Sequence, residues 1–122
     1  MNNRRDILES YNASLIQHGK LNNRVYLIKL AEADYPEILG ALDELAEKHQ
    51  YTKIFAKVPV GFKAGFLGRG YNEEALIPAF YRGQEGASFL GKYFSPSRAK
   101  EQHGETLKAV LQVACQKAAE NL

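Results

Sequence analysis

The stretch from Arg24 to Val58 reads RVYLIKLAEADYPEILGALDELAEKHQYTKIFAKV, and it is the strongest evidence in the sequence for a fold class. Residues 24–30 and 52–58 are rich in β-branched and aromatic side chains, which is typical of strands. Between them, apolar residues recur at helical spacing after Asp34, which can cap a helix, and before His49, where the helix is expected to end. A strand, a helix and a strand in this order predict two parallel strands of one sheet, joined by a right-handed crossover.

The segments on either side of this unit predict further strands and helices. Residues 14–17 are compatible with a short edge strand, and the polar residues before them are expected to be loosely ordered. The remaining predicted elements are a short helix at 60–68, strands at 73–82 and 87–94 joined by a hairpin at Gly83–Gly86, and a long helix at 96–122 with an apolar stripe of Leu107, Val110, Leu111 and Ala114.

This alternation predicts an α/β (α+β) fold, in which a mixed β-sheet is flanked by helices and ends in a long C-terminal helix. The expected organisation is a loosely ordered segment at 1–13, an α/β domain at 14–95 and a C-terminal helix at 96–122. The apolar stripe of that last helix predicts that it packs either on its own sheet or on a partner, such as a second copy of the chain.

Length and composition exclude several classes of protein. A chain of 122 residues, 45% of them hydrophobic and 25% charged, is expected to fold as one globular domain. Its net charge is only +2 and its basic residues are scattered, so nucleic acid is not an expected partner. Its apolar runs are far shorter than the roughly 20 residues that cross a bilayer, so no membrane association is expected. The single cysteine, Cys115, cannot form an internal disulfide, which favours a cytoplasmic location.

Two common kinds of site chemistry find no support in the sequence. His18, His49 and His103 lie far apart, with no cysteine or second histidine at ligand spacing, so no metal site is expected. Cys115 lies four residues after Leu111 in the predicted helix, the position of a small buried side chain rather than of a nucleophile. His18, in a predicted turn, is the histidine that could contact a substrate.

The glycines of Gly65-Phe66-Leu67-Gly68-Arg69-Gly70 have the spacing of loops whose backbone amides bind a pyrophosphate. Such a loop must follow a strand and open a helix, because only then do the amides and the helix dipole face the anion. Here Gly65, Gly68 and Gly70 end a short predicted helix and precede a strand. We therefore interpret the match as a decoy, and we expect no cofactor site in this chain.

Acidic and tyrosine side chains near the last two predicted strands are the remaining candidates for a site. Glu73 and Glu74 begin a strand, so their side chains point to opposite faces, although either could bind the ammonium group of a substrate. Tyr81 and Tyr93 could line a cleft. The expected substrate-binding residues are Tyr71, Glu73, Glu74, Tyr81, Tyr93 and His18, and no residue is expected to be catalytic.

Five blocks of the sequence are informative: SLIQHG at 14–19, NRVYLIKL at 23–30, YTKIFAKVP at 51–59, GYNEEALIPAFY at 70–81 and FLGKYF at 89–94. Taken in this order, they resemble the β-lysine N-acetyltransferases of the GNAT superfamily. The resemblance implies a GNAT-like fold. It also implies a parent enzyme that uses acetyl-CoA to acetylate the side-chain amino group of β-lysine, giving Nε-acetyl-β-lysine, a compatible solute accumulated under salt stress.

The sequence departs from this family in length and in its cofactor loop. Members of the family are considerably longer, and their acetyl-CoA loop, Gln/Arg-x-x-Gly-x-Gly/Ala, lies in a C-terminal GNAT domain. Gly65 stands where the Gln or Arg of that loop would be. The run from 52 to 94 resembles the closing half of a GNAT fold, in which a helix ends in a Gly-aromatic pair, here Gly70-Tyr71, before the last two strands. The resemblance thus implies a degenerate, GNAT-like N-terminal domain.

Three functions are compatible with these observations. In the first, the chain is a non-catalytic N-terminal domain that helps to form the substrate cleft or a dimer interface beside a C-terminal GNAT catalytic domain. In the second, it is a free-standing, dimeric binding module without enzymatic activity. In the third, it is a complete minimal acetyltransferase, with Glu73 or Glu74 as the base and Tyr81 or Tyr93 as the acid. The missing cofactor loop favours the first function, with a small-molecule amine as the ligand and the chain inactive by itself.

Overall fold

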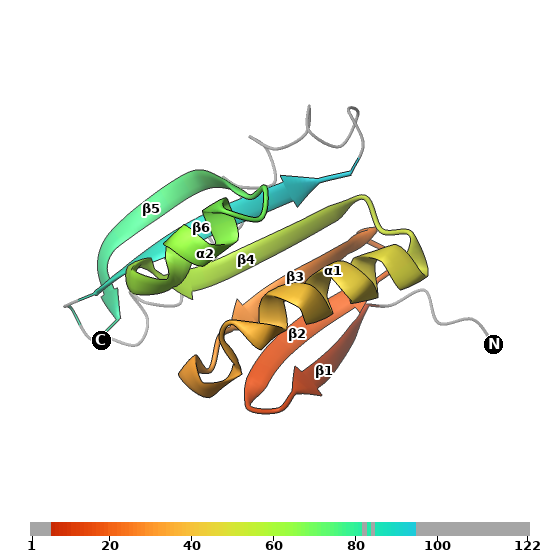
Figure 1. Ribbon diagram of the computed structural model, residues 1–122, viewed down its shortest axis with the longest axis horizontal. Coiled ribbons are helices and arrows are strands. Elements are labelled where there is room, and N and C mark those ends of the chain that lie inside the picture. The colour runs from red at the N-terminus through yellow and green to blue at the C-terminus, as the bar shows by residue number, and fades with distance from the viewer. Residues whose placement is uncertain (1–5, 82, 84, 95–122) are drawn as a thin grey trace.

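The computed structural model describes residues 6–81, 83 and 85–94 of the chain. Within this part, six strands form one sheet in the order β1-β2-β3-β4-β6-β5 (Figure 1). The strands are β1 (Ile7–Tyr11), β2 (Ser14–Gly19), β3 (Arg24–Lys29), β4 (Lys53–Pro59), β5 (Asn72–Tyr81) and β6 (Glu85–Tyr93). The helices are α1 (Glu37–His49) and α2 (Lys63–Leu67), preceded by the 3₁₀ turns η1 (Glu32–Asp34) and η2 (Val60–Phe62). The predicted helix at 96–122 lies outside the described residues.

The centre of the sheet is the parallel pair that the sequence predicts. Arg24–Leu27 of β3 pair with Lys53–Ala56 of β4, and α1 connects the two strands. On one side β1, β2 and β3 form an antiparallel meander, and on the other side β6 lies between β4 and β5, antiparallel to both. The expected mixed sheet is therefore confirmed, and β4, α2, β5 and β6 follow one another in the order that the resemblance implies.

The N-terminal segment is more ordered than the sequence predicts. A loosely ordered segment is expected at 1–13, but Ile7–Tyr11 form the edge strand β1, which pairs along its whole length with β2. Asn12, at φ 53°, supplies a left-handed residue to the tight turn between them. Nearly every side chain of β1 is exposed, so its sequence does not alternate between apolar and polar residues as a half-buried strand would. Backbone hydrogen bonds, rather than buried side chains, attach β1 to β2. Consequently β2 is an inner strand and not an edge.

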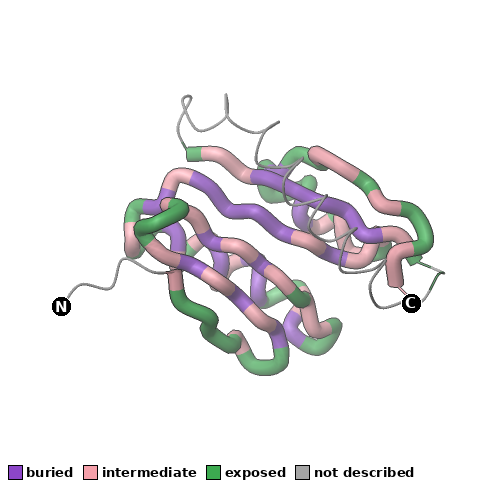
Figure 2. Tube along the Cα trace, turned by 180° about the vertical axis from the view of Figure 1, so that it is seen from behind, coloured by how far each residue is buried: buried purple, intermediate pink, exposed green. Residues whose placement is uncertain are grey.

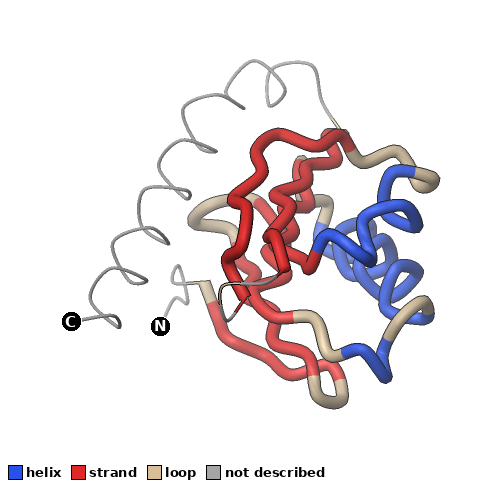
Figure 3. The backbone as a smooth tube through the Cα atoms, turned by 90° about the vertical axis from the view of Figure 1, so that its left-hand side faces the viewer, coloured by secondary structure: helices blue, strands red, loops and turns tan. Residues whose placement is uncertain are grey.

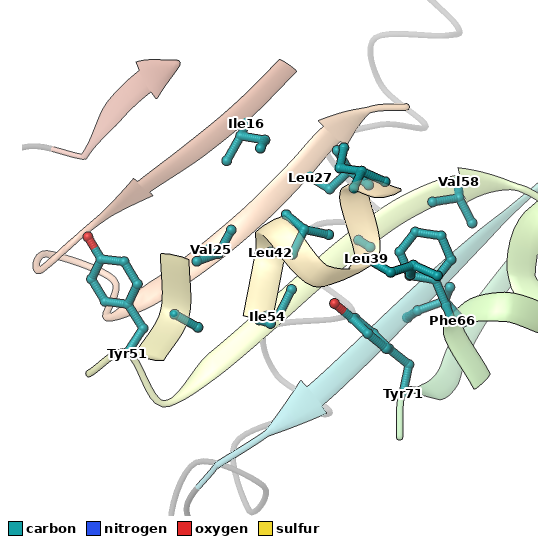
Figure 4. Packing of buried hydrophobic residues seen from close by; sticks show 14 residues of the cluster. Ile16, Val25, Leu27, Leu39, Leu42, Tyr51, Ile54, Val58, Phe66 and Tyr71 are labelled. Atoms are coloured by element: carbon teal, nitrogen blue, oxygen red, sulfur yellow. The ribbon is translucent and has the colours of Figure 1, made fainter. Parts of the chain in front are cut away.

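The main hydrophobic core lies between the sheet and α1. Both α1 and α2 lie on the same face of the sheet (Figure 3). Leu42 of α1 is fully buried and packs among Val25 and Ile54 of the parallel pair (Figure 4). Phe66 of α2 and Tyr71 extend this core toward β5 and β6, with their ring centroids 5.1 Å apart in a T-shaped arrangement. Buried residues accordingly run along the middle strands of the sheet (Figure 2).

The other face of the sheet carries a smaller, aromatic cluster. Phe55 of β4 and Phe89 of β6 are buried there, with ring centroids 5.9 Å apart, and Tyr26 of β3 packs against them. Lys53 is fully buried beside this cluster, its Nζ 4.8 Å from the ring centroid of Phe55 and 5.0 Å from that of Tyr93. An ammonium group over aromatic rings gains cation–π attraction, which offsets part of the cost of burying the charge.

We expect Leu42→Ala to lower the free energy of unfolding by about 3 kcal/mol, because it removes a fully buried side chain and leaves a cavity beneath α1. Urea denaturation followed by circular dichroism measures the change. Leu67→Ala is the matched control: this side chain is 41% exposed, and its loss should cost less than about 1 kcal/mol. Equal losses for the two variants would contradict the core described above.

Candidate functional site

The parallel strands separate at their carboxyl ends and leave a pocket there. Their pairing ends at Leu27 and Ala56, although β3 continues to Lys29 and β4 to Pro59. The space at this end forms a pocket of about 450 Å³, which we call the splay pocket. Its lining residues are Leu15, Ile28, Lys29, Leu30, Lys57, Pro59 and Tyr81. Open α/β sheets bind ligands at the carboxyl ends of their parallel strands, so the splay pocket is the first candidate site.

The splay pocket is largely apolar and cationic. Lys29 and Lys57 are its charged residues, and none of its described lining residues is acidic. Burial, with smaller contributions from Glu85 and Tyr26, raises the pKa of Tyr81 to about 12. The Tyr81 hydroxyl therefore stays protonated near neutral pH and can donate a hydrogen bond but cannot act as a base. These groups suit a neutral or anionic part of a ligand better than an ammonium group.

The turn that joins β3 to α1 is closed by its own hydrogen bonds. The buried carboxylate of Asp34 accepts the Ser14 hydroxyl at 2.7 Å and the Ala13 amide at 3.2 Å. Ser14 Oγ in turn accepts the Ala31 amide at 2.8 Å. The hydrogen bond from Ser14, ahead of the other contacts, lowers the pKa of Asp34 below its usual value. We call this set of residues, Ala13, Ser14, Ala31 and Asp34, the Asp34 corner; it fastens the β3–α1 turn to the β1–β2 turn.

The start of α1 differs from the sequence prediction. Asp34 is expected to cap the helix, but its carboxylate is bonded to Ser14, and α1 begins at Glu37 without a side-chain cap. Pro36, the N-cap residue, has no amide hydrogen to offer an anion. A helix start binds phosphate through free amides and its positive dipole end. Here the turn contains no glycine, and Glu32 and Glu37 add two carboxylates beside Asp34, so the start of α1 carries negative charge.

The amides at the end of the glycine run are already hydrogen-bonded within the chain. Gly65 lies within α2, where a Cβ would clash with the ring of Tyr35, so the glycine admits that side chain. The amides of Gly68 and Gly70 donate to carbonyls of the preceding turn at 3.0 and 3.2 Å. The run ends a short helix and precedes β5, in the reversed order that the sequence predicts.

The two acidic residues at the start of β5 point to opposite faces. Glu73 lies on the α2 side, where it accepts the Ser88 hydroxyl at 2.6 Å and pairs with Lys63 at 3.2 Å. The hydrogen bond from Ser88, together with Lys63, lowers the pKa of Glu73, which makes it a weak base. Glu74 accepts the hydroxyl of Tyr93 on the face that carries the aromatic cluster.

Tyr71 and His18 lie apart from these groups. Tyr71 is buried in the main core, whereas His18 is buried near the opposite edge of the sheet. The hydroxyl of Tyr51 is 2.9 Å from His18 Nδ1, and the carboxylate of Glu9 is 2.5 Å from its Nε2. Because an ionised carboxylate only accepts, Nε2–H donates to Glu9, and Nδ1 shares its hydrogen bond with the Tyr51 hydroxyl. Both ring nitrogens are thus occupied within the chain, which leaves none for a substrate.

The predicted substrate-binding residues therefore do not converge on one site. His18 is on β2 rather than in a turn, the other five are on or beside β5 and β6, and β3 and β4 lie between the two groups. Of the six, Tyr81 lines the splay pocket. The sequence analysis did not select Lys29 and Lys57, which line the splay pocket. Their position near the carboxyl ends of the two predicted parallel strands could have identified them as candidates. The Asp34 corner was also missed, because nothing in the sequence pairs residue 14 with residue 34.

The described residues also bear on a metal site and on a membrane span. No group of histidine, cysteine and acidic side chains in that part of the chain is arranged to hold a metal ion. None of its helices is long and apolar enough to cross a bilayer.

Two solved structures that share this arrangement are acetyltransferases. The ribosomal-protein-S18-alanine N-acetyltransferase of Escherichia coli superposes with a TM-score of 0.51 and 18% identity, over 77% of this chain and 72% of that chain. An IAA acetyltransferase of Bacillus cereus ATCC 14579 superposes with a TM-score of 0.51 and 11% identity, over 66% of this chain and 67% of that chain. The fold is therefore that of the GNAT acetyltransferases.

Within that class, the sequence is similar to the β-lysine N(6)-acetyltransferase of Methanococcus maripaludis. The two are 32% identical over 100 residues, which make up 82% of this chain but 36% of that protein. The expected resemblance to the β-lysine N-acetyltransferases is thus confirmed, and the chain spans about a third of the length of this relative. No protein-family model matches the chain.

The folded-state pKa of Asp34 lies below its unfolded value of about 3.9, so its ionised form stabilises the fold above that pH. This stabilisation is lost as the pH falls through the folded-state pKa. We expect Asp34→Asn to lower the Tm near neutral pH, and the difference from the wild type to shrink as the pH falls below about 4 and through the folded-state pKa. Thermal denaturation at a series of pH values measures this. Glu32→Gln, an exposed neighbour in the same turn, is the control and should leave the Tm unchanged; a difference independent of pH would contradict the role of the charge.

Proposed function

We propose that this chain is a non-catalytic, GNAT-fold N-terminal domain of an acetyl-CoA-dependent β-lysine N6-acetyltransferase. Its role is to help form the substrate cleft or a dimer interface beside a C-terminal catalytic domain, which binds acetyl-CoA. The parent enzyme makes Nε-acetyl-β-lysine, a compatible solute, in the cytoplasm under osmotic stress. The similarity to the Methanococcus maripaludis enzyme supports the substrate, and the 36% of that enzyme matched here leaves space for a catalytic domain elsewhere in its chain.

The closed turn between β3 and α1 is the observation that carries the non-catalytic role. Coenzyme A presents phosphates, and a helix start binds phosphates through free backbone amides. Here the Ala31 amide donates a hydrogen bond to Ser14 Oγ, and the Ser14 hydroxyl donates one to the Asp34 carboxylate. Phosphate oxygens in this turn would also approach the carboxylates of Glu32 and Glu37, and like charges at such short range repel strongly.

The groups that could serve a complete minimal enzyme support the same conclusion. A general acid and a general base must both reach the reacting atoms. Glu73 has a lowered pKa and lies on the α2 face, whereas Glu74 accepts the hydroxyl of Tyr93 on the other face. Tyr81 lines the splay pocket without either carboxylate beside it. Glu74 and Tyr93 do lie together, but the Tyr93 hydroxyl is hydrogen-bonded to Glu74 itself, and neither residue lines the splay pocket.

We expect no saturable heat when acetyl-CoA is titrated into the 122-residue chain, with or without β-lysine, because the Ala31 amide in the turn after β3 is already bonded to Ser14 and the carboxylates of Glu32 and Glu37 repel phosphates. Isothermal titration calorimetry makes the measurement, and an acetyl-transfer assay on the same samples should show no product. The full-length Methanococcus maripaludis enzyme is the positive control. Saturable micromolar binding by the chain, or turnover at an ordinary enzymatic rate, would contradict the proposal.

A further inference from the structure

The two helices of the described part of the chain lie on one face of the sheet, and neither covers the other face (Figure 3). We call this other face the aromatic face, after the rings of Tyr26, Phe55 and Phe89. Phe55 is nevertheless only 1% exposed and Phe89 is 0% exposed. A sheet buries the apolar side chains of a face against a second layer of structure. The aromatic face therefore needs a covering layer that neither α1 nor α2 supplies.

Three cationic side chains lie among the rings of the aromatic face. The Cζ of Arg24 lies 5.2 Å from the ring centroid of Tyr26, and the Nζ of Lys57 lies 5.5 Å from that of Phe80. Lys53 is fully buried beside the same cluster. A second copy of the chain, packed on this face about a two-fold axis, would bring the same cations against each other. Like charges repel strongly where water is excluded, so these residues disfavour a second copy as the covering layer.

The segment that follows β6 starts beside this face and is long enough to cross it. Tyr93, the last residue of β6, has its ring on the aromatic face, with the ring centroid 5.0 Å from Lys53 Nζ. Residues 96–122 continue the chain from there. As a helix they would extend about 40 Å, at about 1.5 Å per residue. The strands β3, β4, β6 and β5, neighbours in the sheet at a spacing of about 4.8 Å, together span roughly 15 Å.

The sequence of this segment also has the pattern of a covering helix. Its apolar stripe is formed by Leu107, Val110, Leu111 and Ala114, which share one side of a helix because they are three or four positions apart. Most of the stability of a helix in a protein comes from burying such a stripe. Because the segment is attached to β6, it meets the aromatic face at a higher effective concentration than a separate partner does. The segment is therefore the occupant that the face favours.

We propose that residues 96–122 form a helix whose apolar stripe packs on the aromatic face and closes it. The helix then lies on the chain's own sheet rather than on a partner, the two positions that the sequence leaves open. With helices on both faces of the sheet, a second copy of the chain or another domain has to dock at the sheet edges or on the outer sides of the helices. This inference does not depend on the proposed function.

Paramagnetic relaxation enhancement, measured by NMR on the ¹⁵N-labelled 122-residue chain, tests this position. A nitroxide is attached to the double variant Cys115→Ser/Gln116→Cys, because residue 116 lies on the side of the predicted helix opposite the stripe. We expect the nitroxide to broaden the amide signals of β3 and β4 more than those of α1, since α1 lies behind the sheet and the broadening falls steeply with distance. Equal or stronger broadening of α1, or no broadening of the sheet, would overturn the inference.

Two controls test the stripe and separate the chain's own segment from a second copy. Adding Leu111→Asp should abolish the selective broadening, because a carboxylate in the stripe is costly to bury. Gln112→Asp, on the opposite side of the helix, is the matched control and should preserve it. In a mixture of nitroxide-labelled chain without ¹⁵N and ¹⁵N-labelled chain without nitroxide, we expect no broadening. Broadening in the mixture, or the same loss from both aspartate variants, would contradict the inference.

Discussion

The buried carboxylate of Asp34 is the interaction on which the rest of this structure depends. It accepts a hydrogen bond from the Ser14 hydroxyl, and Ser14 Oγ accepts one from the Ala31 amide. The carboxylate thus links the β1–β2 turn to the β3–α1 turn. This contact sets where β3 ends and where α1 begins, and hence how the helix returns the chain to β4 in the parallel pair. It also places a negative charge in the turn where a cofactor phosphate would need free amides. The same contact therefore supports the fold and argues against acetyl-CoA binding.

Much of the sheet could be predicted from the sequence, because its buried elements leave a periodic pattern. The parallel strands, α1 and the β5–β6 hairpin appear near their predicted positions, since side chains such as Leu42 and Ile54 must face one core. The edge strand β1 was not predictable in this way, because its exposed side chains follow no apolar alternation. The helix cap at Asp34 was predicted wrongly, because capping rules consider only neighbouring residues. The Asp34 carboxylate instead accepts a hydrogen bond from the hydroxyl of Ser14, twenty residues earlier.

The candidate site was less predictable than the fold, because a site depends on which side chains converge in space. Glu73 and Glu74 are adjacent in sequence, yet one pairs with Lys63 and the other accepts the hydroxyl of Tyr93 across the sheet. His18 is held by Glu9 and Tyr51 and has both ring nitrogens occupied. These contacts join residues that are far apart in the sequence or face opposite sides of the sheet, so no local pattern could have predicted them.

The solvent exchange of the Ala31 amide proton, measured by NMR with and without acetyl-CoA, tests the central claim most directly. We predict strong protection of this amide that acetyl-CoA does not change, because Ser14 Oγ already holds it. Rapid exchange in the absence of acetyl-CoA, or protection that develops only when acetyl-CoA is added, would contradict the claim, since the turn after β3 would then be free to bind phosphate.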